Sequence, residues 1–234
     1  MKKVTSIVLN NFKNDSRVLK ENISLQKAGY DVQVVALHEE LLNEFEKVQN
    51  IPVHRVKLKS RGWSKQKLVQ LIKYFEFIFR VVKQYKTSDI LHCNDLNALP
   101  IGVIIKNFFN KDAKIVYDAH EYEINDVPNQ SQRSIKIKYY IEKFFIKYAD
   151  KVITVSNAIA DEYVKLYNEI IKNEKYNFIK LYEENREFYF CFVDKIELDI
   201  AEFIPKDAKL ICYDKALDDS TKMNLKEKID LETF

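Results

Sequence analysis

Short apolar segments alternate with longer amphipathic segments over most of the chain. The apolar segments are rich in β-branched residues, which is typical of strands buried on both faces of a sheet. Six such strands are predicted, at residues 4–9, 31–36, 53–58, 89–93, 114–118 and 151–155. Helical patterns separate most of them, so the chain is predicted to adopt an α/β fold with a doubly wound, parallel, Rossmann-like sheet of about six strands.

The first predicted helix has a defined beginning and end. Asp15 or Ser16 can accept hydrogen bonds from the free amides of its first turn, and Gly29 stands where the chain leaves the helix. The turn before it, residues 10–15, contains no glycine. Its backbone therefore cannot approach a pyrophosphate as a glycine-rich loop does, which excludes a dinucleotide site there.

The longest helical pattern carries apolar residues around most of its circumference. One face comprises Leu68, Leu71, Ile72, Phe75, Phe79 and Val82. Charged residues interrupt the apolar run too often for a transmembrane span of about 20 residues. Two interpretations remain. The pattern favours a core helix with a solvated basic edge, and the alternative is a helix that lies on anionic lipid, with Trp63 and Lys65 at its start.

The composition is that of a folded protein, with 47% hydrophobic and 31% charged residues among 234. The N-terminal apolar run is too short for a secretory signal and is interpreted as the first strand. The three cysteines, at 93, 191 and 212, lack metal-ligand spacing and fit free thiols in a reducing compartment. We therefore expect a cytoplasmic protein.

Charge is distributed unevenly and suggests a boundary near Tyr167. Residues 1–167 hold 27 Lys and Arg against 19 Asp and Glu, whereas residues 168–234 hold 11 against 16. We predict a Rossmann-like domain at 1–167 and an acidic α/β extension at 168–234. In the extension, strands are expected at 186–193 and 209–213 and a helix at 194–203.

Polar residues directly follow four of the predicted strands. They are Asn10 and Asn11, then His92, Asn94 and Asp95, then Asp118, His120 and Glu121, and finally Ser156 and Asn157. The carboxyl ends of parallel strands share one edge of a sheet, where ligands bind. A binding crevice is therefore predicted at this edge, and the alternative is a set of unrelated loops with structural hydrogen bonds.

Two classes of partner are not expected. The four histidines, His38, His54, His92 and His120, lie far apart in the sequence without ligand spacing, so no metal site is predicted. The basic residues are spread over several helices without interleaved reading motifs, so no nucleic acid partner is predicted.

Four segments together resemble the N-terminal domain of family 4 glycosyltransferases. They are residues 14–32, 90–96, 116–121 and 149–156. The resemblance implies a GT-B fold, in which two Rossmann-like domains face each other and the N-terminal one binds the acceptor. It further implies a metal-independent, retaining transferase of bacterial surface polysaccharide or glycolipid synthesis. Such an enzyme needs no cofactor, because the nucleotide sugar is a substrate.

The resemblance also implies roles for individual residues. His120 would lie beside the reacting sugar, and Glu121 would orient the sugar or the acceptor, so these two are the candidate catalytic residues. The candidate substrate-binding residues are Asn11, Arg17, His92, Asn94, Asp95, Asp118, Ser156 and Asn157. Carboxylates and a hydrogen-bonding histidine can stabilise the oxocarbenium character of a transferred sugar.

The residues after 167 depart from the family pattern. No two glutamates stand eight positions apart, so the family's Glu-x7-Glu pair, which resembles a clamp on the donor, is absent. Residues 168–234 contain no glycine, and Arg186 is their one arginine. A donor-binding domain is therefore expected from a partner chain.

Three functions remain open from the sequence. The first is a glycosyltransferase that transfers sugar to an acceptor glycan or a lipid-linked sugar, with peripheral contact at the inner face of the membrane. It is either complete only with a partner that supplies a donor-binding domain or a shortened relative with residual activity. The second is a non-catalytic acceptor-binding or scaffolding module that lost its donor half. The third is a sugar-nucleotide epimerase, a class that shares the two-domain fold.

Overall fold

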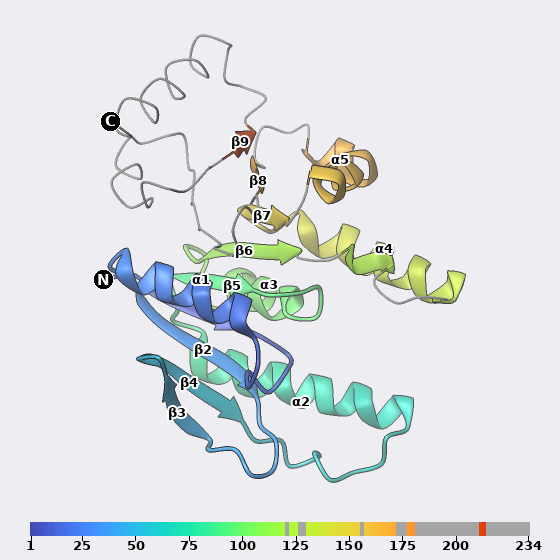
Figure 1. Ribbon diagram of the computed structural model, residues 1–234. Helices are drawn as coiled ribbons and strands as arrows, with labels where there is room; N and C mark the ends of the chain where they lie inside the picture. The colour runs from blue at the N-terminus through green and yellow to red at the C-terminus, as the bar shows by residue number, and fades with distance from the viewer. Residues whose placement is uncertain (120–121, 126–129, 155–156, 172–176, 181–210, 214–234) are drawn as a thin grey trace.

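Nine strands of the described residues form one sheet (Figure 1). The computed structural model describes residues 1–119, 122–125, 130–154, 157–171, 177–180 and 211–213. The strands are β1 (Lys3–Ile7), β2 (Asp31–Leu37), β3 (Phe45–Val48), β4 (Ile51–Val56), β5 (Ile90–Cys93), β6 (Lys114–Ala119), β7 (Lys151–Thr154), β8 (Asn177–Lys180) and β9 (Ile211–Tyr213). The order is β3-β4-β2-β1-β5-β6-β7-β8-β9.

The central part of the sheet is parallel, which confirms the predicted fold class. Only the outer pairs β3–β4 and β8–β9 are antiparallel. From β1 the chain builds outward in one direction through β2 and β4, and then in the other direction from β5 to β8. The switch point therefore lies between β1 and β5, and ligands of such sheets bind at the carboxyl ends of the strands there.

The helices cover both faces of the sheet. They are α1 (Ser16–Lys27), α2 (Lys67–Tyr85), α3 (Leu99–Phe108), α4 (Gln132–Ile146) and α5 (Asn157–Ile171), with a short 3₁₀ helix η1 (Glu123–Asn125). On one face, α1 packs through Val18 and Leu25. On the other face, α2, α3 and α5 share a large core with strand residues such as Ile115 and Tyr117. The strands are thus buried from both sides, as their continuous apolar runs predict.

The predicted ends of the first helix are confirmed. Asp15 Oδ1 accepts a hydrogen bond from the amide of Val18 at 3.2 Å, and this caps α1. Gly29 has a φ of +85°, in the left-handed region that glycine adopts without strain. Local capping chemistry was enough to locate both ends.

The β3–β4 hairpin was not predicted. Its two-residue turn is Gln49-Asn50, with φ values of 48° and 69°. Primed turns of this kind need left-handed backbone at both positions, and Asn-Gly is their usual sequence. Without a glycine, the turn carried little signal, and the sequence pattern indicated only the second of the two strands.

After β5, residues 96–98 form a turn and α3 begins at Leu99, with Pro100 in its first turn. The predicted strand at 209–213 overlaps β9, which pairs with β8 in the same sheet. The predicted strand at 186–193 and helix at 194–203 lie outside the described residues, and the domain division near residue 167 stays a prediction.

The two apolar stripes of α2 have opposite environments. The stripe with the most regular spacing is exposed, with Leu68 at 70% and Phe79 at 68%. The core contacts come from the other stripe: Phe77, Ile78, Val81, Val82 and Tyr85. The helix therefore contributes to the core, but of the face that the sequence pattern singled out only Val82 is buried. No described helix is long and apolar enough to cross a membrane.

Candidate functional site: a buried polar cluster at the switch point

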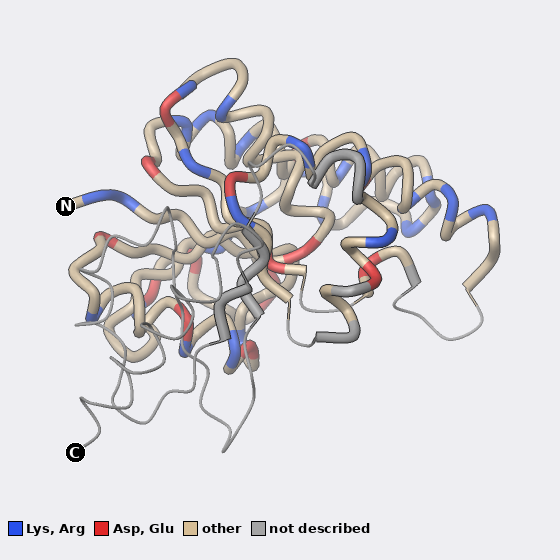
Figure 2. Tube along the Cα trace, turned by 90° about the horizontal axis from the view of Figure 1, so that it is seen from above, with Lys and Arg blue, Asp and Glu red and all other residues tan. Residues whose placement is uncertain are grey.

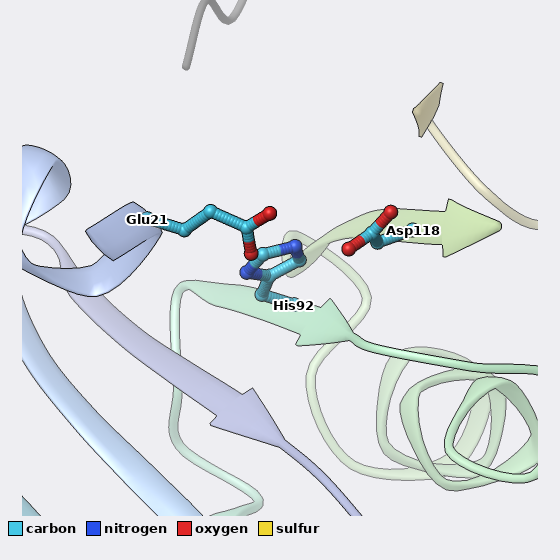
Figure 3. Close-up of side chains that lie close together, drawn as sticks. All are labelled: Glu21, His92 and Asp118. Atoms are coloured by element: carbon cyan, nitrogen blue, oxygen red, sulfur yellow. The ribbon is translucent and has the colours of Figure 1, made fainter. Parts of the chain in front are cut away.

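Polar side chains from four elements meet where the strand order reverses. Figure 3 shows Glu21 of α1, His92 of β5 and Asp118 of β6 pointing toward one another. We name this set, together with its hydrogen-bonded neighbours, the buried polar cluster. Its members are Ser6, Arg17, Glu21, Asn22, His92, Asn94 and Asp118.

Strand and helix periodicity explain how these residues reach one another. Ser6 pairs with His92 across β1 and β5, and Asp118 stands two positions beyond the partner of His92 on β6. Side chains at such positions point to the same face of the sheet. Arg17 and Glu21 lie one turn apart on α1, the helix that covers this face.

Arg17 holds the two carboxyl groups of the cluster. Its Nη1 donates to the carboxylate of Asp118 and, at 3.1 Å, to Oε1 of Glu21. Asp118 is fully buried, Glu21 is 1% exposed, and the Arg17 side chain is 17% exposed. Buried charges of this kind are stable only when they are paired, so Arg17 is essential to the arrangement.

Burial decides the protonation of the other two members. Burial raises the pKa of Glu21 well above its ordinary value, and the negative charge of Asp118 raises it further. Burial also lowers the pKa of His92 to about 4, although Asp118 opposes this shift. At neutral pH, His92 is therefore uncharged, and the pKa of Glu21 is shifted in the direction of the protonated form.

Four acceptor oxygens of the cluster have no hydrogen-bond partner among the described residues. They are Glu21 Oε2, Asn22 Oδ1, Asn94 Oδ1 and Asp118 Oδ1. The asparagine donors are used: Asn94 Nδ2 donates to Ser6 Oγ at 2.9 Å, and Asn22 Nδ2 donates to Val18 O at 2.6 Å. Because buried acceptors in proteins are almost always paired, this set suits a ligand or water that brings donors such as hydroxyl groups.

The cluster also has the atom types of a metal site. One ligand atom each from Glu21, His92 and Asp118 lie within 4.8 Å of one another. Sequence spacing gave no hint of this set, because its members come from three separate elements. Arg17, however, contacts both carboxyl groups, and its positive charge opposes a cation at the same place. The residues therefore fit a metal ion poorly, and the absence of a metal site stays a prediction.

The profile of Glycosyltransferase Family 4 matches residues 23–179, more than half of the chain. The chain belongs to glycosyltransferase family 4. Of the buried polar cluster, His92, Asn94 and Asp118 lie within the matched residues, and the other members precede them.

Solved structures show the same fold at low sequence identity. A sucrose-phosphate synthase from Thermosynechococcus elongatus aligns with a TM-score of 0.60 and 14% identity, over 88% of this chain and 54% of that one. The catalytic domain of starch synthase IV from Arabidopsis thaliana, bound to ADP and acarbose, aligns with a TM-score of 0.53 and 12% identity, over 77% and 51%. The chain thus spans about half the length of these structures. A search of curated proteins found no match.

Four of the eight predicted substrate-binding residues of the family 4 chain lie together, and a fifth is their neighbour in the sequence. Arg17, His92, Asn94 and Asp118 come together in the buried polar cluster. Asp95 follows directly, and its Oδ1 accepts from the amide of Ala98 at 2.7 Å. Burial raises the pKa of Asp95 to about 7, although the backbone hydrogen bonds oppose this shift.

Asn11 lies apart from the cluster, and four other predicted residues are not described or only partly so. The side chain of Asn11 donates to Glu39 Oε2 at 2.6 Å, and its carbonyl accepts from Arg55 Nε at 2.7 Å, on the β4 side of the sheet. Three predicted residues, His120, Glu121 and Ser156, lie outside the described residues. Asn157 begins α5, but its side chain lies outside the described part.

Glu21 and Asn22 were missed by the sequence analysis. Both stand between Val18 and Leu25 on the buried side of α1. These two polar residues interrupt the apolar, buried side of the helix. A polar pair inside an apolar helix face was the available signal, because such residues stay buried only when tertiary partners receive them.

Another buried carboxyl group lies on the opposite face of β6. Glu142 of α4 accepts hydrogen bonds from the hydroxyls of Tyr117, Tyr163 and Tyr167, at 2.5, 2.6 and 2.6 Å. Burial raises its pKa, although the three tyrosine hydrogen bonds oppose the shift. This set, which we name the tyrosine cluster, ties α4 to β6 and α5.

Proposed function

We propose that this family 4 chain is the acceptor-binding half of a glycosyltransferase, which moves a sugar from a nucleotide-sugar donor to an acceptor glycan or a lipid-linked sugar. The observation that carries the proposal is the set of unpaired, buried acceptor oxygens at the switch point of the sheet. Sugars present many hydroxyl donors, and sites built from fixed acceptors select such ligands through the cost of leaving the acceptors unpaired.

In this proposal, Asp118 and Asn94 accept hydrogen bonds from sugar hydroxyls. Arg17 fixes the Asp118 carboxylate and neutralises it, so the group can be buried before the ligand arrives. His92 is uncharged at neutral pH and adds no positive charge that would compete for Asp118. The cluster is thereby preorganised, and little binding energy is lost in ordering it.

His120 and Glu121 are the proposed catalytic residues. In the sequence they directly follow β6, whose last residues are Asp118 and Ala119. There, a carboxylate and a histidine would stabilise the positive charge that develops on the transferred sugar. The reaction would retain the configuration of the sugar, and no metal takes part in it.

The donor is proposed to be a nucleotide sugar bound by a second domain, from a partner chain. The starch synthase structure of the same fold, with its bound ADP, supports this class of donor. We also propose a role in bacterial surface polysaccharide or glycolipid synthesis, at the inner face of the membrane. The alternative is an acceptor-binding or scaffolding module without catalysis, and an epimerase would need the same second domain.

The test measures sugar transfer from a panel of UDP- and GDP-sugars to lipid and glycan acceptors, with and without the candidate donor domain. We expect transfer only when the donor domain is present. His120→Ala should abolish it without changing the melting temperature, whereas the matched variant His38→Ala, in the connection after β2, should leave it intact. If His120→Ala melts the domain, the histidine is structural. If the assembled protein binds acceptor but transfers nothing, the non-catalytic alternative is correct.

A further inference from the structure

Three helices on one side of the sheet carry large apolar side chains that stand exposed. Each of these side chains is between 40% and 77% exposed. They are Trp63, Leu68, Leu71, Ile72, Phe75 and Phe79 in and before α2, Phe108 and Phe109 at the end of α3, and Ile137, Tyr140, Ile141 and Phe144 on α4. Scattered single apolar residues are normal on protein surfaces, but continuous stripes mark interaction sites.

The stripes on α2 and α4 point away from the same face of the sheet. On each helix, the exposed residues recur every three or four positions, so each stripe occupies one side of its helix. The opposite sides face inward, through Phe77 and Val81 on α2 and through Glu142 and Ile146 on α4. Because α2 and α4 both pack beside α3 in one layer (Figure 1), the two stripes belong to one outer surface.

Basic side chains stand exposed on α2 and α4, whereas the acidic residues of these two helices are hydrogen-bonded or buried. Each of the two helices contains a single acidic residue, Glu76 on α2 and Glu142 on α4. Glu76 accepts from Ser60 Oγ at 2.6 Å and Arg80 Nε at 2.8 Å, and Glu142 is fully buried in the tyrosine cluster. The exposed basic residues on and beside these helices are Lys65, Lys67, Lys83, Lys86, Arg133, Lys136 and Lys147. In Figure 2, Lys and Arg recur along the helical layer.

The lysines lie directly beside the aromatic rings. Lys147 Nζ is 4.6 Å from the ring centre of Phe144, and Lys86 Nζ is 5.8 Å from that of Phe109. A cation beside an exposed ring is the arrangement expected where an apolar side chain enters the lipid and the charge stays at the headgroups.

The loop that presents Trp63 is fastened to α2. Lys73 Nζ donates to the carbonyl of Trp63 at 2.8 Å and to that of Ser64 at 3.3 Å. Glu76 of α2 also holds the segment before the loop, because its carboxylate accepts hydrogen bonds from Lys59 and Ser60. Burial alone would raise the pKa of Glu76, but hydrogen bonds from Ser60, Lys59 and Arg80 lower it to about 2. Glu76 therefore stays charged at neutral pH. The loop is therefore ordered before it meets a partner, which reduces the entropy lost on binding.

We propose that the exposed faces of α2 and α4, with the end of α3, form a docking surface for a bilayer that contains anionic lipids. The apolar side chains enter the interface, and the lysines contact headgroup phosphates. A second copy of this chain is a poorer occupant, because it would bring two basic surfaces together. The proposal rests on the membrane location given under the proposed function and adds the surface that would dock. Its test is separate from the transfer assay, because docking requires no sugar transfer.

The chain has a built-in reporter, because Trp63 is its only tryptophan. The intact protein is mixed with vesicles of phosphatidylcholine alone or with phosphatidylglycerol, and flotation and tryptophan emission are measured. We expect at least about tenfold more protein bound to the anionic vesicles, with a blue shift of the emission. Both effects should weaken as salt rises, because exposed charges are screened.

Two double variants test the two helices separately. Phe75→Ser with Phe79→Ser on α2, and Ile137→Ser with Phe144→Ser on α4, should each lower the partition to anionic vesicles by about tenfold or more. Both pairs are exposed, so the melting temperature should change little. The matched control is Leu41→Ser, which replaces another exposed apolar side chain, in the connection before β3. This variant should bind vesicles as the parent does.

Several outcomes overturn the proposal. Absence of vesicle binding refutes it, as does binding that neither pair reduces. A loss of binding with the α2 pair alone refutes a shared surface. If the variants dissociate an oligomer of the chain and leave vesicle binding unchanged, the surface is a protein interface. None of these outcomes bears on the transfer assay, so the two proposals fail separately.

Discussion

Two buried acidic clusters lie on opposite faces of β6 and differ in how completely they are hydrogen-bonded. Tyr117 and Asp118 are neighbours in this strand and therefore point to opposite sides. On the side of Tyr117, Glu142 accepts three tyrosine hydroxyls. On the side of Asp118, Arg17 satisfies one oxygen each of Asp118 and Glu21, and the second oxygen of each has no partner among the described residues.

The difference separates a structural role from a binding role. The tyrosine cluster joins three elements with every Glu142 oxygen in use, so it has no capacity for a ligand. The buried polar cluster retains acceptors at the switch point, where ligands of this fold bind. Partial satisfaction of a buried network weakens stability, and proteins tolerate it chiefly at functional sites.

The largest effect is expected from Glu142→Ala. It leaves three buried tyrosine hydroxyls without their acceptor, and we expect the free energy of unfolding to fall by about 3–5 kcal/mol. Urea denaturation followed by circular dichroism measures this change. Glu142→Gln, which keeps one acceptor oxygen, should lose less. A loss below about 1 kcal/mol for the alanine variant would show that the tyrosine cluster is not a main structural contact.

Arg17→Met is expected to lower the free energy of unfolding by a smaller amount, about 2–4 kcal/mol, because it leaves the buried Asp118 carboxylate without its cation. Urea denaturation measures it, and a double-mutant cycle with Asp118→Asn isolates the pair: the double variant should recover part of the stability lost by Arg17→Met. Additive effects of the two changes would mean that Arg17 and Asp118 are not coupled.

The smallest change in the free energy of unfolding is expected from Glu21→Gln at acidic pH. There, the protonated carboxyl of the parent and the amide of the variant are both neutral. The raised pKa of Glu21 means that the folded state holds its proton more tightly than the unfolded state. The stability that this proton contributes is full below the unfolded pKa and declines as pH rises toward the folded value. The glutamine variant should not show this decline.

Denaturation of both proteins from pH 4 to pH 8 measures the difference, with Glu39→Gln as the control, a glutamate whose side chain is 46% exposed. Comparison with the parent is necessary because His92, with a pKa near 4, adds an opposite trend between pH 4 and 6.5. Parallel curves for the parent and Glu21→Gln would contradict the raised pKa.

Sequence patterns located much of the fold but missed several contacts that define the site. The cap at Asp15, the turn at Gly29 and the central parallel strands follow from local chemistry, and the fold and family assignments were confirmed. Glu21 escaped notice because its importance depends on Asp118, and Arg17, which joins them, lies 101 residues from that carboxylate. The β3–β4 turn escaped notice because Gln49-Asn50 lacks the usual glycine.

The sequence by itself determined the alternation of strands and helices, the ends of α1, the polar strand ends and the family, because each of these depends on residues close together in the chain or on a motif. Only the tertiary structure decided which stripe of α2 is buried, which polar residues share the switch point, and that Glu142 joins three tyrosines. These outcomes depend on contacts between distant segments. In α2, two apolar stripes had similar local patterns, and the position of the sheet and α3 selected the one that is removed from water.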